Sequence, residues 1–365
     1  MSGLIVHEWL AKTGGSENVV EALADLFPDA PIMSLWNDLP SRFEDGRVSE
    51  TWLARTPLRR SKALALPLMP LVWRTLPAAS ADWVLCSSHL FSHHARFAGP
   101  ARHAPKYVYV HTPARYIWAP ELDGRGNGIF AKALSVPLKA LDRKRAQEAV
   151  SIAANSEFIR ERIAQSWGRD STVIYPPVSV GAYAGDSESD LTVEESDLLS
   201  SLPETYLLAA SRFVPYKRLD VAIAAGVATG VKVVLAGEGP DEPRLRALAD
   251  EHPGLVTFIP RPSFALLNQL FRRALVYIFP PIEDFGIMPV EAMATGTPVI
   301  ANAIGGAAES VKDGVTGALL RSFDASALRS AVDLAARADS AACIERAWEF
   351  DVTVFNERIK SWIES

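Results

Sequence analysis

Short apolar runs alternate with helical patterns along most of the 365 residues. The first half contains five strand candidates, at 4–6, 81–88, 106–113, 150–159 and 172–178. The second half contains five more, at 205–212, 232–239, 254–260, 274–280 and 297–302. Between most of these runs the apolar residues recur at helical spacing, as in the helix expected from about Ser16. This alternation predicts an α/β fold with two Rossmann-like, mainly parallel sheets facing a cleft.

The length of the chain and one polar segment predict the domain boundaries. A chain of this length exceeds one typical hydrophobic core, so two domains are expected. Residues 179–204 are acidic and rich in serine, which is typical of a linker. We therefore expect a first domain at 1–178 and a second domain that starts at 205.

Composition excludes several classes of protein. Hydrophobic residues make up 48% of the chain, and the formal net charge of −6 gives no support for nucleic-acid binding, which usually needs a basic face. The two cysteines, Cys86 and Cys343, lie far apart in sequence, so a disulfide framework is not expected and a reducing compartment fits. The first 15 residues lack the basic region of a signal peptide, and no uninterrupted apolar stretch is long enough to span a membrane. We expect a cytoplasmic protein.

The segment RRSKALALPLMPLVWRTLP (59–77) joins three cations to a stretch of leucine, methionine, valine and tryptophan. Its prolines prevent one long regular helix. The segment fits a buried connector with a solvated basic edge. It also fits a surface patch that contacts anionic lipid or a lipid-linked substrate at the inner face of the membrane. The sequence leaves both interpretations open.

Two loops of the second half carry candidate phosphate ligands. SRFVPYKRLD (211–220) follows a strand and supplies Arg212 and Lys217, which suit an anionic ligand, although a solvated turn has the same composition. AGEGPD (236–241) is glycine-rich, but Glu242 stands where the dinucleotide fingerprint needs its third glycine. A dehydrogenase is therefore disfavoured.

The stretch FPPIEDFGIMPVEAMATGTPVIA (279–301) places Glu283 and Glu291 eight residues apart. It predicts a strand, a helix that starts near Gly286 and a second strand, so its first loop lies where parallel sheets bind ligands. The backbone N–H groups of Phe285, Gly286 and Ile287 form a helix N-terminus suited to phosphate. Carboxylates repel phosphate but bind vicinal hydroxyls well. Two of them beside a phosphate site indicate a ligand with sugars on both sides of a diphosphate, as in a nucleotide sugar.

This glutamate pair, followed by GTPVIA and GGAAESVKDGVTGALL (305–320), closely resembles the retaining glycosyltransferases of family 4, which have the GT-B fold. The resemblance covers nearly the whole chain. It includes the glycine loop at Gly14 and Gly15, the SRFVPYKR and AGEGPD segments, and a C-terminal helix that crosses back to the first domain. It implies a second domain at 205–345 and a returning helix at 346–365.

The resemblance also implies roles for individual residues. Glu283 holds the hydroxyls of the transferred sugar, and Glu291 holds the ribose. Arg212 and Lys217 neutralise the departing diphosphate, and Gly14, Gly15, Phe285, Gly286 and Ile287 complete the donor site. His111 in HTPARYIW (111–118) aligns with a family histidine near the reacting carbon.

HTPARYIW resembles a branch that includes mannosyltransferases of surface-polysaccharide assembly, which points to GDP-mannose as the donor. FIPRPSFALL (258–267) departs from the family, because Pro260, Arg261 and Pro262 stand where a glycine is usual. In relatives this loop lies near the nucleotide base, so the departure bears on base identity.

The main hypothesis is a metal- and cofactor-independent hexosyltransferase. Its expected partners are a nucleotide diphosphate sugar and a glycan or lipid-linked saccharide acceptor. No Asp-x-Asp pair follows a strand, and no His/carboxylate cluster has the spacing of metal ligands. Two alternatives remain: a nucleotide-sugar epimerase of the same fold, and a non-catalytic nucleotide-sugar-binding protein. The basic pair and both glutamates favour transfer.

Overall fold

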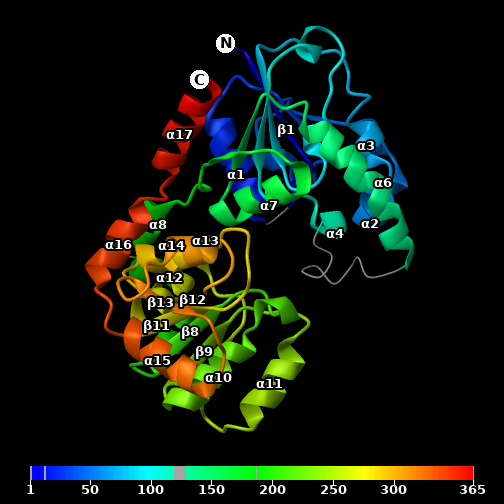
Figure 1. Cartoon of the computed structure of the whole chain (residues 1–365). Coiled ribbons are helices and arrows are strands. Elements are labelled where there is room, and N and C mark those ends of the chain that lie inside the picture. Colours follow the sequence, from blue (N-terminus) through cyan, green and yellow to red (C-terminus); the bar gives the residue numbers. More distant parts are fainter. Residues whose placement is uncertain (1, 12–13, 119–128, 186, 365) are drawn as a thin grey trace. The chain divides into compact units, whose positions relative to one another are not determined.

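The computed structural model describes residues 2–11, 14–118, 129–185 and 187–364, and it divides into two compact units. The first unit is Met1–Pro177 together with Phe355–Ser365, and the second is Val178–Val354. Each unit contains its own parallel sheet and its own helices (Figure 1). The prediction of two Rossmann-like α/β domains is confirmed.

The sheet of the first unit has seven parallel strands in the order β3-β2-β1-β4-β5-β6-β7. Strands β1 and β4 are buried along their whole length, as expected for central strands covered on both faces. The strands are β1 Gly3–His7, β2 Ile32–Ser34, β3 Val48–Glu50, β4 Trp83–Ser88, β5 Lys106–Val110, β6 Ser151–Ala154 and β7 Thr172–Val173.

The helices of the first unit bury apolar faces against this sheet. Helix α1, predicted from the apolar spacing, buries Val19, Val20 and Leu23. The described helices are α1 Gly15–Leu26, α2 Lys62–Ala65, α3 Met69–Val72, α4 Arg115–Trp118, α6 Ile129–Ala146 and α7 Glu157–Trp167. Short 3₁₀ helices lie at Pro40–Arg42, Trp52–Arg55, Pro57–Arg60, Ser92–His94 and Pro100–Arg102.

The sheet of the second unit has six parallel strands in the order β10-β9-β8-β11-β12-β13. They are β8 Tyr206–Ala210, β9 Lys232–Ala236, β10 Val256–Ile259, β11 Val276–Phe279, β12 Val299–Asn302 and β13 Gly317–Leu320. The helices after β8 are α10 Asp220–Thr229, α11 Glu242–Asp250, α12 Phe264–Arg273, α13 Ile287–Ala294, α14 Ala307–Ser310, α15 Ala325–Ala335 and α16 Ser340–Trp348.

The segment 179–204, for which composition predicts a linker, is folded within the second unit. It contains α8 Val180–Ala184, a 3₁₀ turn at Glu188–Asp190 and α9 Val193–Ser201. Arg272 of α12 donates hydrogen bonds to the three carbonyl oxygens of Tyr183, Ala184 and Gly185 at 2.8–2.9 Å. These hydrogen bonds attach the end of α8 to α12.

The C-terminal helix α17 Val352–Glu364 packs on the first unit from Phe355 onward, which confirms the predicted return. Trp362 donates its indole N–H to Ser151 Oγ at 2.7 Å, and the Tyr107 hydroxyl donates to Ile363 O at 3.0 Å. A parallel bridge between Asp351 and Val178 separates α17 from α16. The predicted single closing helix is therefore two helices.

Each sheet has one point where the strand order reverses. In the first unit it lies between β1 and β4, and in the second it lies between β8 and β11. Loops that leave the carboxyl ends of such neighbouring strands diverge and leave space for a ligand. These two points are where polar side chains gather in each unit.

Candidate active site

The predicted phosphate cation and the predicted sugar-binding acid meet at the reversal point of the second sheet. Lys217 lies in a 3₁₀ turn after β8, and Glu283 lies in the loop after β11. Lys217 Nζ donates to Glu283 Oε1 at 2.7 Å, and both side chains are largely buried, at 14% and 17% exposure. A ligand can therefore contact Lys217 or Glu283 only if the pair separates or if the ligand bonds to them while they remain paired.

Arg212 lies in the same loop as Lys217, but its side chain is exposed. Within the described parts of the chain, we find no hydrogen bond or ion pair made by its guanidinium. The neighbouring AGEGPD loop fixes the backbone around it. Phe213 N donates to Glu238 O at 2.8 Å, and Asp241 N donates to Phe213 O at 2.9 Å. Arg212 thus combines a fixed backbone with a free guanidinium, as an anion ligand requires.

Close backbone approach explains why this loop needs glycine. Gly239 has φ of +156°, and a Cβ there would lie 2.4 Å from Phe213 O. Any side chain at this position would push the two loops apart. The glycines of AGEGPD therefore act by bracing the Arg212 loop, which agrees with the missing dinucleotide fingerprint.

Helix α13 begins directly after the Glu283 loop. Gly286 caps it with φ of +90°, a left-handed conformation that favours glycine, while Phe285 is buried and Ile287 is the first helical residue. Gly306 N donates to Glu283 O at 2.8 Å, and a Cβ on Gly306 would lie 2.1 Å from Asp284 O. The GG of the 305–320 motif thus holds the Glu283 loop against the first turn of α13, whose N–H groups lack helical partners.

Glu291 lies in the second turn of α13, in a different environment from Glu283. Burial raises its pKa to about 7, and a hydrogen bond from the Tyr183 hydroxyl offsets part of that shift. Tyr183 belongs to α8, in the segment predicted as a linker. Glu291 is therefore a carboxyl group that changes charge near neutral pH.

The loop that departs from the family pattern has an unusual backbone. Arg261 has φ of +43°, a left-handed value that is uncommon outside glycine. Its side chain is exposed and pairs with Glu238 at 2.6 Å. Arg261 therefore adopts a glycine-like conformation and ties its loop to the AGEGPD loop.

In the first unit, His111 joins a chain of buried side chains at the carboxyl edge of β1, β4 and β5. Its Nε2 lies 2.8 Å from Ser87 Oγ, and His7 Nδ1 lies 3.2 Å from both Ser87 Oγ and Ser87 O. Burial and the neighbouring His89 and His7 lower the pKa of His111 well below its usual value. The imidazole is thus neutral at physiological pH, suited to hydrogen bonding with a hydroxyl group.

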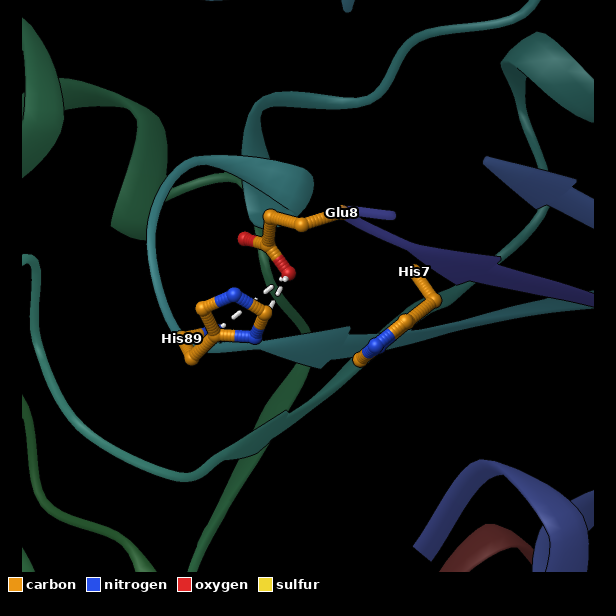
Figure 2. Close-up of side chains that lie close together, drawn as sticks. All are labelled: His7, Glu8 and His89. Atoms are coloured by element: carbon orange, nitrogen blue, oxygen red, sulfur yellow. Dashed lines mark hydrogen bonds and ion pairs between the residues drawn. The ribbon is translucent and has the colours of Figure 1, made fainter. Parts of the chain in front are cut away.

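Glu8 and His89 continue this cluster across the reversal point between β1 and β4. Figure 2 shows the Glu8 carboxylate directed at His89, with the His7 ring extending toward the same region. Glu8 Oε1 accepts from Leu90 N and Ser92 N at 2.8 Å each, and Glu8 Oε2 lies 3.4 Å from His89 Nδ1. The carboxylate therefore fixes the loop after β4.

A second polar cluster is buried under helices α4, α6 and α7. Asp142 Oδ1 lies 3.1 Å from His93 Nε2 and 3.0 Å from His94 Nε2. Its Oδ2 accepts indole N–H bonds from Trp118 at 2.6 Å and Trp167 at 2.7 Å. Contacts with both histidines keep the pKa of Asp142 below its ordinary value despite burial. One carboxylate thus connects four segments of the first unit.

Two family models match the chain, one for each half. Residues 13–181 match the model described as Glycosyltransferase Family 4, and residues 193–347 match Glycosyl transferases group 1. Both halves of the chain are thus similar to glycosyltransferases, and each match covers less than half of the chain. The matched ranges follow the two structural units closely.

Curated proteins similar to this chain include the D-inositol 3-phosphate glycosyltransferases of Mycobacterium sp. (strain KMS) and Mycobacterium tuberculosis (strain ATCC 25177 / H37Ra). They are 33% and 30% identical over 204 and 211 residues. The matches span 52% and 54% of this chain and 45% and 43% of the relatives, so less than half of each relative is covered.

Solved structures share the fold over the full length. Anabaena Alr3699/HepE in complex with UDP-glucose has a TM-score of 0.72 at 20% identity and covers 99% of both chains. Sucrose-phosphate synthase from Thermosynechococcus elongatus has a TM-score of 0.69 at 16% identity, covering 100% of this chain and 98% of its own. At these identities the likeness establishes the GT-B fold.

Among the residues predicted for the family 4 site, the structure joins Lys217 and Glu283 directly. Arg212, Phe285, Gly286, Ile287 and Glu291 lie on the loops and the helix around that pair, while His111, Gly14 and Gly15 belong to the first unit. Gly14 caps α1, and Gly15 is its first residue; both are exposed.

Sequence reasoning missed Tyr183, His7, Glu8 and His89. The signal available for the last three was their position just after the ends of predicted strands. The expectation that no His/carboxylate cluster exists rested on sequence spacing. Among the described residues two such clusters form, His7–Glu8–His89 and His93–His94–Asp142, because their members come from separate segments.

Proposed function

We propose that the chain transfers a hexose from a nucleoside diphosphate sugar to a hydroxyl group of a glycan or lipid-linked saccharide, with retention of configuration. The observation that carries this proposal is the Lys217–Glu283 pair at 2.7 Å beside the first turn of α13. It places a cation for the diphosphate next to an acid for sugar hydroxyls. The two matching family models, both of glycosyltransferases, support the same reaction class.

The donor site is proposed to use charge complementarity without a metal ion. Arg212 and Lys217 grip the diphosphate, and the N-terminus of α13 adds oriented N–H groups. Glu283 orients the hexose, and Glu291 accepts hydrogen bonds from the ribose. His111, in the first unit, is retained as a proposed catalytic residue because its neutral imidazole can both donate and accept.

Two observations bear on the identity of the donor, and they favour different nucleotides. HTPARYIW resembles the mannosyltransferase branch and supports GDP-mannose. Structural neighbours solved with UDP-glucose and with UDP-2-fluoro glucose support a uridine nucleotide. The left-handed Arg261 occupies the loop on which base choice is proposed to depend. GDP-mannose is our first choice, and UDP-glucose is the alternative.

The experiment that tests the function is incubation of the protein with each donor, with and without saccharide acceptors, followed by product analysis. Transfer with retention, persisting in EDTA, is the expected result. Epimerised donor would establish the isomerase alternative, and binding without turnover would establish a non-catalytic protein. Full loss in EDTA with rescue by magnesium or manganese would contradict the metal-free mechanism.

The pKa of Glu291 predicts how donor binding depends on pH. A carboxyl with pKa about 7 must be ionised to accept two ribose hydrogen bonds. Donor affinity should therefore fall about tenfold between pH 8 and pH 6, following the ionised fraction. Calorimetric titration with an intact nucleotide sugar measures this, because its diphosphate diester does not titrate in that range.

Two variants separate Glu291 from other titrating groups. Tyr183→Phe removes the hydrogen bond that lowers the pKa of Glu291, so the inflection should move to higher pH. Glu291→Gln should bind more weakly, with a flat profile from pH 6 to pH 8. A wild-type inflection that persists in Glu291→Gln would assign the titration to another group.

Peripheral membrane contact through 59–77 is a further proposal, and the structure describes this surface. Leu64 and Leu71, from α2 and α3, are 67% and 56% exposed, although Trp73 and Met69 beside them are buried. Among the described residues no helix is long and apolar enough to cross a membrane. Any contact by these helices would therefore be at the surface of the bilayer.

Liposome flotation with anionic lipid tests this contact. Leu64→Ser/Leu71→Ser should reduce the bound fraction at least about tenfold, since each buried leucine contributes roughly 1.5–3 kcal/mol. Val193→Ser, at a position 75% exposed on α9, serves as the control and should float like wild type. Equal flotation of all three proteins would remove the proposal.

A further inference from the structure

The side chains at the reversal point of the first sheet have a feature that the proposed transfer does not use. His7 and Glu8 are fully buried at the end of β1. The side chain of His89, just after β4, is largely buried, at 20% exposure. One ligand atom from each of these three residues lies within 4.8 Å of the other two. His89 lies 82 residues after His7 and 81 residues after Glu8 in the sequence. The pairing of β1 with β4 brings the three residues together.

The Nδ1 atom of His7 lies 3.2 Å from both Ser87 O and Ser87 Oγ. A carbonyl oxygen can only accept, so in the tautomer that pairs with Ser87 O the proton is on Nδ1. The Nε2 lone pair is then bare and buried, and no hydrogen-bond partner for it exists in the described residues. His89 Nδ1 likewise makes no hydrogen bond with the described residues, and Glu8 Oε2 lies 3.4 Å from it. Two buried imidazole nitrogens without partners are costly unless something binds them.

Glu8 offers the third ligand. Its Oε1 is saturated by the two short N–H bonds from Leu90 and Ser92. Its Oε2 has only long contacts, 3.3 Å to His89 N and 3.4 Å to His89 Nδ1. The carboxylate is therefore held in place by one oxygen while the other keeps a lone pair that faces the imidazole rings (Figure 2).

We infer that His7, Glu8 and His89 form a binding site for a divalent transition-metal ion of the zinc type. Two imidazoles and one carboxylate with a fourth position open are a known ligand set for Zn²⁺. Tetrahedral zinc bonds place neighbouring ligand atoms roughly 3.3 Å apart, close to the 3.4 Å between His89 Nδ1 and Glu8 Oε2. The Ser87 carbonyl supplies the outer hydrogen bond that metal-ligating histidines usually make.

The other His/carboxylate cluster also contains imidazole nitrogens without a hydrogen bond, on His93 and His94, but it differs in its carboxylate and its exposure. Both oxygens of Asp142 are already occupied, by His93 and His94 on one side and by two indole N–H groups on the other. Its two histidines are buried, at 0% and 1% exposure, whereas the His89 side chain is 20% exposed and gives a route for the ion. The site is therefore assigned to His7–Glu8–His89 alone.

Calorimetric titration of the chelator-treated full chain with ZnCl₂ tests the inference, independently of transfer activity. Wild type should bind one equivalent, and Mg²⁺ should not compete, because it prefers oxygen ligands. His89→Ala should weaken binding by more than the 10–100-fold typical of losing an outer-shell partner. His103→Ala removes an exposed histidine of the same unit and should bind like wild type.

The result that overturns the site is an absence of stoichiometric Zn²⁺ binding by wild type, or equal binding by wild type and His89→Ala. Circular dichroism checks that the variant is folded. If it is not, the visible spectrum of wild type with Co²⁺ decides. An intense d–d absorption of four-coordinate cobalt, displaced by Zn²⁺, supports the site, and a weak octahedral spectrum refutes it.

Discussion

Glu283→Ala is expected to reduce transfer by about two to three orders of magnitude while leaving nucleoside diphosphate binding nearly intact. The proposed contact of Glu283 with hexose hydroxyls strengthens in the transition state, and such contacts are worth roughly 3–4 kcal/mol. Removing the carboxylate also releases Lys217, which it holds at 2.7 Å. The freed ammonium can then contact the diphosphate, so affinity for GDP or UDP should be retained.

Glu291→Ala is the matched comparison, because it removes the same group from the same helix region. Its proposed partner is the ribose, so nucleotide binding itself should weaken by roughly 1–3 kcal/mol. Both titrations belong at pH 8, where Glu291 is mostly ionised given its pKa of about 7. If the two acids only cap or solvate α13, both variants will bind and turn over normally. The same pattern in both variants, or a Glu283→Ala rate within a few-fold of wild type, contradicts the assignment.

The sequence predicted ten of the strands from their apolar runs and missed β2, β3 and β13, of which β13 is a four-residue apolar run, GALL, that follows a turn. Strands β2 and β3 have three residues each, and β3 is largely exposed, so neither has a long apolar run or a clear alternation. The prediction of a linker at 179–204 differs from the structure, which has helices there, because its composition is ambiguous. Serine and acidic residues favour helix N-caps as well as loops, and Thr192 with Glu195 forms a capping box at the start of α9.

The candidate site also has a part that could be predicted from the sequence and a part that could not. Glu283 and Glu291 are close in sequence, so spacing alone indicated a shared loop and helix. The Lys217–Glu283 pair and the Ser87 link between His7 and His111 depend on which strands are neighbours, and a single sequence does not give strand order. Tyr183 was missed because its segment has the composition of a linker, yet its hydroxyl hydrogen bond offsets part of the rise that burial causes in the pKa of Glu291.

Asp142→Asn is expected to be the most destabilising substitution in the first unit. The carboxylate accepts hydrogen bonds from buried donors on His94, Trp118 and Trp167, and its Oδ1 also lies 3.1 Å from His93 Nε2. The asparagine side chain keeps one acceptor oxygen and replaces the other by an NH₂ group. That NH₂ group then faces the donors that the lost oxygen had accepted from, and those donors lose their acceptor. Breaking a buried charged network costs about 3–5 kcal/mol.

Thermal unfolding with the two units resolved measures this effect. For a unit of this size the loss corresponds to a decrease in Tm of roughly 10 °C. Asp170→Asn is the control, because Asp170 pairs with Arg160 in the same unit but is 81% exposed, and surface pairs contribute roughly 0–1 kcal/mol. Similar Tm values for the two variants would show that the four contacts are weak. A large loss confined to the first unit would identify Asp142 as the group that joins α4, α6, α7 and the loop after β4.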